Sequence, residues 1–128
     1  MTAVKTRDII ESFSGNFPLL QKVYSVYEKS PLISQDQENT LRKSIESTTL
    51  EILELIVVAS RQFSEGKKET LIQAMRKIDT LKVFVDMAIK TSYVDGKHGE
   101  EFQESVNGVG AMVGGWLKAV NTKKEKED

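Results

Sequence analysis

Gly108-Val-Gly-Ala-Met-Val-Gly-Gly-Trp-Leu-Lys-Ala-Val-Asn121 carries four glycines in eight residues, within a segment whose apolar residues otherwise indicate an amphipathic helix. A glycine inside a helix costs roughly 0.5–1 kcal/mol relative to alanine, and the usual return is the close approach of another backbone. On a helical wheel, Gly108, Gly115 and Ala119 lie on one flank of the apolar face, and Gly110 and Gly114 lie on the other. Such a helix can pack against more neighbours than one small bundle supplies, so the segment predicts self-assembly.

Apolar residues recur at spacings of three and four along the chain, which predicts an all-α protein. The first helix spans roughly residues 4–29 and is broken near Pro18, with Asn16 available to cap its main part. The third helix spans roughly 67–93, and its apolar face contains Leu71, Ala74, Met75, Ile78, Leu81, Val85, Ala88 and Ile89. The last helix begins near residue 100, and its apolar face contains Phe102, Val106, Val109, Val113, Trp116, Leu117 and Val120.

The second helix has two apolar faces. It is expected from 34–36 to about Arg61, with an inward stripe of Leu41, Ile45, Thr48, Ile52, Leu55, Ile56, Ala59 and Phe63. A second patch, Leu50, Leu53 and Val57, lies on nearly the opposite side. An up-down antiparallel four-helix bundle has no central position that would bury both faces. We therefore predict a homo-oligomer, with an interface formed by Leu50, Leu53, Val57, Gly108, Gly115 and Trp116.

Length and composition indicate one soluble domain. The chain has 128 residues and no cysteine, which excludes disulfides and thiolate metal sites. We expect a bundle over residues 1–121 and a charged, flexible tail over 122–128. No signal peptide is apparent, and the longest apolar run (55–59) is far shorter than the roughly 20 residues that span a bilayer. A cytoplasmic location without a membrane partner is the expectation.

Catalytic and metal-binding patterns are weak. His98, the one histidine of the chain, has no second histidine or cysteine to assist it, and a solvated loop residue is the simpler interpretation. Paired glutamates such as Glu51 and Glu54 lack the Glu-x-x-His pattern of bundle metal sites. The glycine-rich segment lies within a helix, whereas a dinucleotide-binding loop follows a strand. We expect no enzyme activity, no cofactor and no metal.

Positive residues give the candidate binding surface. The net charge is −1, from 18 Lys+Arg and 19 Asp+Glu, so a phosphate-binding surface would have to be local. Lysines near helix ends also serve solubility and the helix dipole. Copies arranged in a ring would instead concentrate such residues into a surface able to neutralise phosphates. The candidates for nucleic-acid or partner binding are Arg61, Lys67, Lys68, Arg76, Lys77, Lys118, Lys123 and Lys124.

The chain resembles the accessory variability determinant (Avd) proteins of diversity-generating retroelements, within a broader group of four-helix bundles that includes proteins encoded in ribosomal RNA intervening sequences. The resemblance covers about residues 17–121. It rests on the second helix, Leu50 to Arg61, and on a terminal small-small-Trp-hydrophobic-basic-x-Val-Asn pattern. That pattern is matched by Gly114, Gly115, Trp116, Leu117, Lys118, Val120 and Asn121.

The resemblance implies a non-catalytic accessory protein that forms a homopentameric ring with a positive surface. Such a ring would bind the element's reverse transcriptase and template RNA and support mutagenic complementary DNA synthesis. The chain departs from the family's strongly basic character, because its third helix balances Arg76, Lys77, Lys82 and Lys90 against Asp79 and Asp86. The alternative is a bundle of the ribosomal intervening-sequence type, with a protein or RNA partner and no retroelement role.

Overall fold

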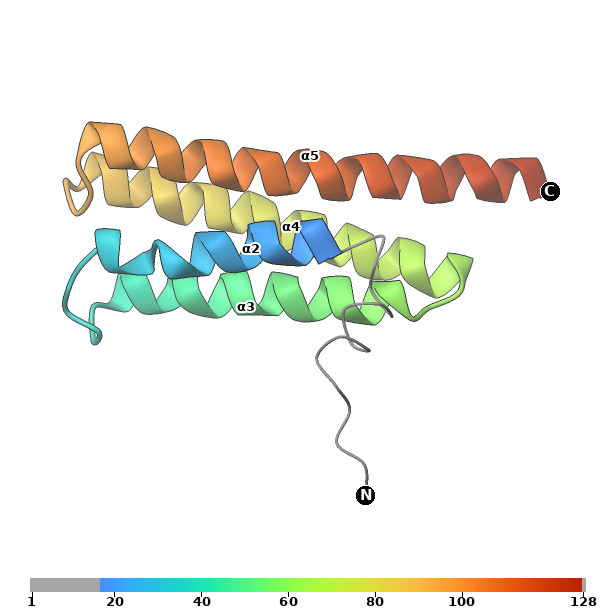
Figure 1. The fold of residues 1–128 in the computed structure, drawn as a ribbon, viewed down its shortest axis with the longest axis horizontal. Coiled ribbons are helices and arrows are strands. Elements are labelled where there is room, and N and C mark those ends of the chain that lie inside the picture. The colour runs from blue at the N-terminus through green and yellow to red at the C-terminus, as the bar shows by residue number, and fades with distance from the viewer. Residues whose placement is uncertain (1–16, 128) are drawn as a thin grey trace, which may run out of the picture.

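Four helices that run alternately in opposite directions make up most of the structure (Figure 1). The computed structural model describes the backbone of residues 17–127 and the side chains of residues 18–122. The helices are α2 (Phe17–Glu28), α3 (Thr40–Ser60), α4 (Ser64–Lys90) and α5 (Gly96–Glu127), and a short 3-10 turn, η1 (Ser30–Leu32), follows α2. Each helix packs against two others, in the closed order α2, α3, α4, α5. The predicted all-α four-helix bundle is confirmed.

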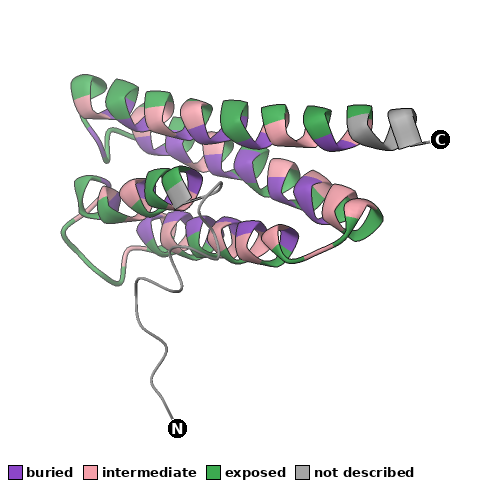
Figure 2. Cartoon of the chain, turned by 45° about the vertical axis from the view of Figure 1, so that its right-hand side comes forward, coloured by how far each residue is buried: buried purple, intermediate pink, exposed green. Residues whose placement is uncertain are grey.

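The apolar faces of the helices meet along the bundle axis, where the buried residues lie on the inner side of each helix (Figure 2). In α3 the buried face includes Ile45, Ile52 and Ile56, and in α4 it includes Leu71 and Ile78. In α5 the predicted face is buried from Phe102 to Val113, whereas Trp116 and Leu117 are partly buried. The three-to-four periodicity therefore identified most of the core, because each helix buries one stripe against its neighbours.

The helices differ greatly in length, and this makes the two ends of the bundle unlike. Helix α2 has 12 residues, whereas α5 has 32. The Lys29 Nζ donates to the Ser105 Oγ at 2.7 Å, which places α2 beside the first half of α5. At the opposite end, where α3 passes into α4, the described helices present are α3, α4 and the second half of α5 (Figure 1). We call this the α3–α4 end.

Several helix boundaries differ from the sequence expectation. Helix α3 begins at Thr40 rather than near 34–36, because the Asn39 Oδ1 accepts a hydrogen bond from the Arg42 amide at 3.0 Å and caps the first turn. Helix α4 begins at Ser64, three residues before the expected start near residue 67. Helix α5 continues to Glu127, beyond the expected boundary at residue 121. The expected short N-terminal helix and the Asn16 cap lie outside the described residues.

The turn between α4 and α5 contains two backbone features that the residue pattern did not predict. Ser92 adopts a left-handed φ of 63°, and the Tyr93 amide donates to the Ala88 carbonyl at 3.0 Å, which ends α4. Gly99 is buried in the first turns of α5, where an added Cβ would lie 2.6 Å from the Ile89 Cγ1. The close approach of α4 and α5 at this turn therefore depends on Gly99. Within residues 17–127, no helix is long and apolar enough to cross a membrane.

Candidate nucleic-acid and partner interface

Four of the predicted cations lie at the α3–α4 end. Arg61 is the C-cap residue of α3 and is exposed, and Lys67 and Lys68 follow in the first turns of α4. Lys118 is exposed on α5, two residues beyond Trp116. Because α4 and α5 pack in opposite directions, the start of α4 lies beside the second half of α5. Arg61 caps α3 just before α4, and Lys67 of α4 contacts Trp116, two residues before Lys118, so Arg61 and Lys118 lie at the same end of the molecule although they are distant in sequence.

Lys67 makes the contact that joins α4 to α5 at this end. Its Nζ lies 5.9 Å from the centre of the Trp116 ring, within the range of a cation–π interaction. Both side chains are partly buried, and Trp116 also packs against the core. These contacts within one copy of the chain give Trp116 a role in the bundle that needs no second copy.

Phe63 is the most exposed large apolar side chain in the described structure, with 94% of its surface accessible. Its spacing had placed it on the inward stripe of the second helix, and this prediction was wrong. Helix α3 ends at Ser60, so the helical periodicity no longer governs the direction of a side chain three residues later. Phe63 is instead the N-cap residue of α4, with an extended backbone (φ −78°, ψ 168°). No signal in the residue spacing distinguishes these two arrangements.

Arg76 and Lys77 lie apart from this group, near the middle of α4. The Lys77 Nζ forms an ion pair with the Glu51 Oε2 at 2.7 Å across the α3–α4 contact. Arg76, Lys77 and Glu51 line one surface hollow between α3 and α4, together with Glu54 and Val58. Carboxylates therefore accompany both cations, which lowers the positive potential available to a phosphate. Among the predicted positive residues with described side chains, Arg76 and Lys77 are therefore separate from the group at the α3–α4 end. The side chains of Lys123 and Lys124 lie outside the described residues.

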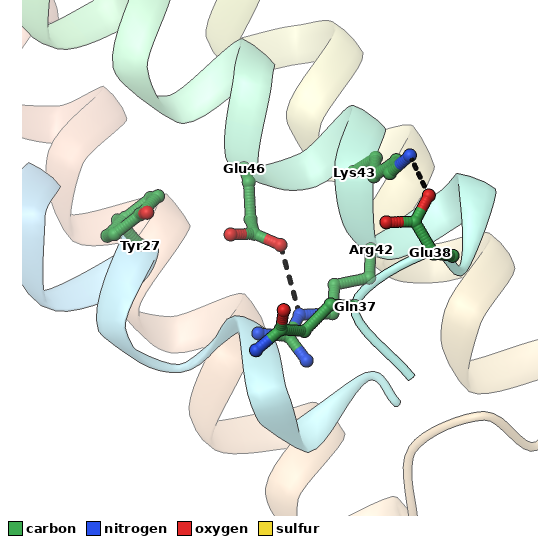
Figure 3. A pocket seen from close by; sticks show the side chains of 6 residues that line it. All are labelled: Tyr27, Gln37, Glu38, Arg42, Lys43 and Glu46. Carbon is green, nitrogen blue, oxygen red and sulfur yellow. Dashed lines mark hydrogen bonds and ion pairs between the residues drawn. The ribbon is translucent and has the colours of Figure 1, made fainter. Parts of the chain in front are cut away.

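An apolar strip runs along the outer flank of α3 that faces α2. Leu50 is 43% exposed, and Leu53 and Val57 are partly buried on the same flank. Glu46 lies one helical turn before Leu50 on the same flank. Because Glu46 lines a hollow together with Tyr27 of α2, this flank of α3 faces α2 (Figure 3). On α2, Tyr24 is 48% exposed and stacks on Tyr27 with ring centres 5.5 Å apart. We call Leu50, Leu53 and Val57 the apolar strip.

The hollow beside the strip, of about 450 Å³, is lined by charged groups that pair with one another (Figure 3). The Arg42 Nε donates to the Glu46 Oε1 at 3.0 Å, and its Nη1 donates to the Ser34 carbonyl at 2.9 Å. The Lys43 Nζ lies 2.5 Å from the Glu38 Oε2, and this hydrogen bond raises the pKa of the Lys43 ammonium. Since Arg42 is nearly buried and holds the segment before α3 in place, we assign it a structural role.

The glycines of α5 separate into those that one copy explains and those that it does not. A Cβ added to Gly108 would overlap the Lys22 Cε, and one added to Gly110 would meet the Ile78 Cγ2 at 3.4 Å. Gly108 and Gly110 therefore face α2 and α4. Cβ atoms added to Gly114 and Gly115 would meet nothing within 4 Å. Glycine at these two positions lowers helix stability, and no close contact in the described part of one copy compensates for that loss.

The residues with catalytic potential are arranged as a helix cap. The Asp95 Oδ1 accepts a hydrogen bond from the His98 amide at 2.9 Å, and its Oδ2 lies 2.5 Å from the His98 Nδ1. The pair is exposed, and its mutual hydrogen bonds raise the pKa of His98 and lower that of Asp95. The residues with described side chains contain no group of three or more His, Asp or Glu that could hold a metal ion. The arrangement at Asp95 stabilises the start of α5.

The sequence comparison identifies the family. The family model described as bAvd-like matches residues 17–120, which include all of α2, α3 and α4 and most of α5. This chain belongs to the bAvd-like family. No curated protein and no solved structure matches it. The bAvd-like match agrees with the Avd resemblance carried by Gly114 to Val120, and the four-helix bundle agrees with the fold which that resemblance implied.

Proposed function

We propose that this bAvd-like protein is a non-catalytic accessory protein of a diversity-generating retroelement, which binds the reverse transcriptase and the template RNA during mutagenic complementary DNA synthesis. The observation that carries the proposal is the family match over residues 17–120. The function of such a protein is to hold a polymerase and a nucleic acid together, so the charge and shape of its surface determine what it binds.

For RNA, the favoured surface is the α3–α4 end. It brings together Arg61, Lys67, Lys68 and Lys118, whereas the central cation Lys77 is paired with Glu51. Phosphate neutralisation by lysine and arginine releases counterions, so binding that uses these residues weakens steeply with salt. The net charge of −1 implies weak binding by one copy, and a ring would present several such ends to the same RNA.

A salt titration tests RNA binding directly. The full chain is titrated with single-stranded template RNA at several salt concentrations, and the slope of log K against log salt is measured. Replacing Lys67 and Lys68 by glutamine should make the slope shallower by roughly 0.7 for each phosphate that is no longer neutralised. The matched control replaces Lys90 and Lys97 by glutamine. These lysines lie at the opposite end of the bundle, and their replacement removes the same amount of charge. A flat salt response in the unmodified protein would contradict a phosphate interface.

Binding to the reverse transcriptase is tested separately. The enzyme encoded beside this protein's gene is mixed with the full chain, and complex formation is followed by light scattering. A complex that forms without RNA, and that raises the yield of complementary DNA from the template, supports the proposal. If the neighbouring genes encode no reverse transcriptase and no template and variable repeats, the retroelement role is excluded.

For assembly, we propose a homo-oligomer, the pentamer which the family resemblance implies, with the apolar strip, Gly108, Gly115 and Trp116 contributing to its interface. Support comes from Leu50, which is 43% exposed, and from Gly115, whose added Cβ would meet nothing within 4 Å. Packing of a second backbone at Gly115 is a physical reason for a glycine there.

The substitution Gly115→Leu tests this interface. It should break the assembly into smaller species while circular dichroism shows unchanged helix content, because the added Cβ meets nothing within 4 Å in the described part of its own copy and the side chain would obstruct a neighbouring one. Gly96→Leu adds the same side chain at another exposed position of α5, where an added Cβ likewise meets nothing within 4 Å, and is the control. An unchanged mass by light scattering in the Gly115 variant would remove this residue from the interface.

A further inference from the structure

The α3–α4 end carries an aromatic side chain that neither the core nor the proposed assembly interface uses. Phe63 is 94% exposed at the N-cap of α4, in a position where its backbone is well fixed. The Lys67 amide donates to the Phe63 carbonyl at 2.9 Å, so the helix begins directly at this residue. Burying a phenylalanine side chain stabilises a fold substantially, and this chain leaves it in water.

The turn that holds Phe63 is braced from both sides. The Thr70 hydroxyl lies 2.5 Å from the Gln62 Oε1 and 3.0 Å from the Gly66 carbonyl, and Thr70 is buried. Gln62 and Gly66 flank Phe63 closely in sequence, so the bonds to Thr70 fix the turn on α4. The phenyl ring is therefore presented on a rigid support rather than on a free loop, which lowers the entropy cost of binding through it.

The stretch around the ring carries three cations, Arg61, Lys67 and Lys68, against two carboxylates, Glu65 and Glu69, and a second aromatic ring lies nearby. Arg61 precedes it by two residues, Lys67 lies one helical turn beyond it, and the Lys67 Nζ contacts the Trp116 ring at 5.9 Å. Glu65 lies in the same turn and borders the shallow hollow of about 580 Å³ beside Phe63. Two aromatic rings, one of them in contact with Lys67, thus occupy the end of the bundle which, among the described helices, α3, α4 and α5 form.

We propose that the α3–α4 end binds single-stranded nucleic acid by stacking an unpaired base on Phe63, with the neighbouring phosphates held by Lys67 and Lys68. Exposed aromatic rings interleaved with cations are the usual means of binding single strands without sequence preference. A base within a duplex offers no free face to Phe63, so the site selects unpaired RNA. Protein interfaces, in contrast, are depleted in lysine at their centres, which disfavours a protein occupant.

This inference rests on the proposed RNA binding and adds that the RNA is single-stranded and stacked at one named residue. The experiment measures binding of the full chain to a labelled 12-nucleotide single-stranded RNA and to the duplex of the same sequence at low salt. Phe63→Leu keeps an apolar side chain but removes the ring, and it should weaken single-strand binding by roughly tenfold or more. Phe63→Tyr keeps the ring and should bind as the unmodified protein does.

The matched control is Tyr93→Leu, which removes an exposed ring (51% accessible) at the opposite end and should leave RNA binding unchanged. Trp116, the one tryptophan of the chain, reports on the site by its fluorescence, which should change when single-stranded RNA saturates the protein. The slope of log K against log salt should be the same in Phe63→Leu as in the unmodified protein, because the substitution removes no charge.

The outcomes separate this inference from the proposed function. If the unmodified protein binds RNA and Phe63→Leu binds it equally well, stacking at Phe63 is overturned while RNA binding stands. Equal affinity for single strand and duplex, or a Trp116 emission that RNA does not alter, overturns it as well. If the unmodified protein binds neither RNA, both fail. Loss of reverse transcriptase binding without loss of RNA binding in Phe63→Leu would make Phe63 a protein anchor and overturn the assignment.

Discussion

Gly99 shows how one missing side chain sets the distance between two helices. An added Cβ would lie 2.6 Å from the Ile89 Cγ1 and 3.0 Å from its Cδ1, and Ile89 is itself packed against the core. The branched side chain of isoleucine has few alternative rotamers, so it cannot move aside cheaply. Gly114 and Gly115, on the same helix, have open space instead. Close packing against Ile89 therefore explains the glycine at position 99, but it does not explain the glycines at positions 114 and 115 of the same helix.

We expect Gly99→Ala to destabilise the protein by about 1 kcal/mol, because overpacking at Ile89 exceeds the gain in helix propensity. Chemical denaturation of the unmodified protein and the variant measures the difference. Gly96→Ala is the control, since nothing lies within 4 Å of its added Cβ, and its effect should stay within about 0.5 kcal/mol. Equal stability of all three proteins would show that Ile89 yields without cost.

The Asp95–His98 pair predicts a bounded range of pH in which the start of α5 is most stable. The hydrogen bond that the His98 ring donates to Asp95 raises the pKa of His98 above 6.5, so the stability gained from His98 is present below pH 6.5 and is lost as pH rises through the raised value. Hydrogen bonds from His98 lower the pKa of Asp95 below 3.8, so that contribution is present above 3.8 and is lost as pH falls through the lowered value. Proton NMR should show the His98 pKa returning toward 6.5 in Asp95→Asn, and an unchanged value would exclude the pairing.

At the level of helices, the sequence predicted faces well and boundaries poorly. The buried residues of α4, such as Leu71, Ile78 and Val85, follow the predicted stripe because burial repeats with the helical period. The boundaries depend on individual caps, such as Asn39, which several neighbouring polar residues could equally have supplied. Phe63 was misplaced for this reason, since its exposure follows from the end of α3 at Ser60. The grouping of Arg61 with Lys118 needed the register of α4 against α5, which periodicity does not contain.

Arg42 joins the segment before α3 to that helix, a role that the residue pattern did not indicate. It bonds the Ser34 carbonyl at 2.9 Å and Glu46 at 3.0 Å, while 9% of its surface is accessible. Arg42→Met should destabilise the protein by about 2 kcal/mol, because the hydrogen bond to Ser34 is removed and Glu46 is left without its cation. Lys43→Met, which removes an exposed ion pair, should change stability far less. Equal effects of the two substitutions in denaturation would show that the two pairs have similar weight.

For the molecule as a whole, exposed apolar side chains favour association. Leu50, Val58, Val83 and Met87 each have more than a third of their surface accessible on α3 or α4. If copies associate through such surfaces, unfolding is linked to dissociation, and the melting temperature rises with protein concentration by mass action. Differential scanning calorimetry over a roughly 100-fold range of concentration measures this shift. A constant melting temperature together with a monomeric mass would contradict assembly.

The unequal ends of the bundle have a consequence for any closed ring. In a closed ring whose bundles lay along the rotation axis, all copies would point the same way, and the ring would have two chemically different rims. One rim would repeat the Phe63 turn with its lysines, and the other would repeat the Asp95–His98 cap and the segment before α3. In such a ring, a strand bound on the first rim would leave the second free for a polymerase, so the two proposed occupants would not compete for space.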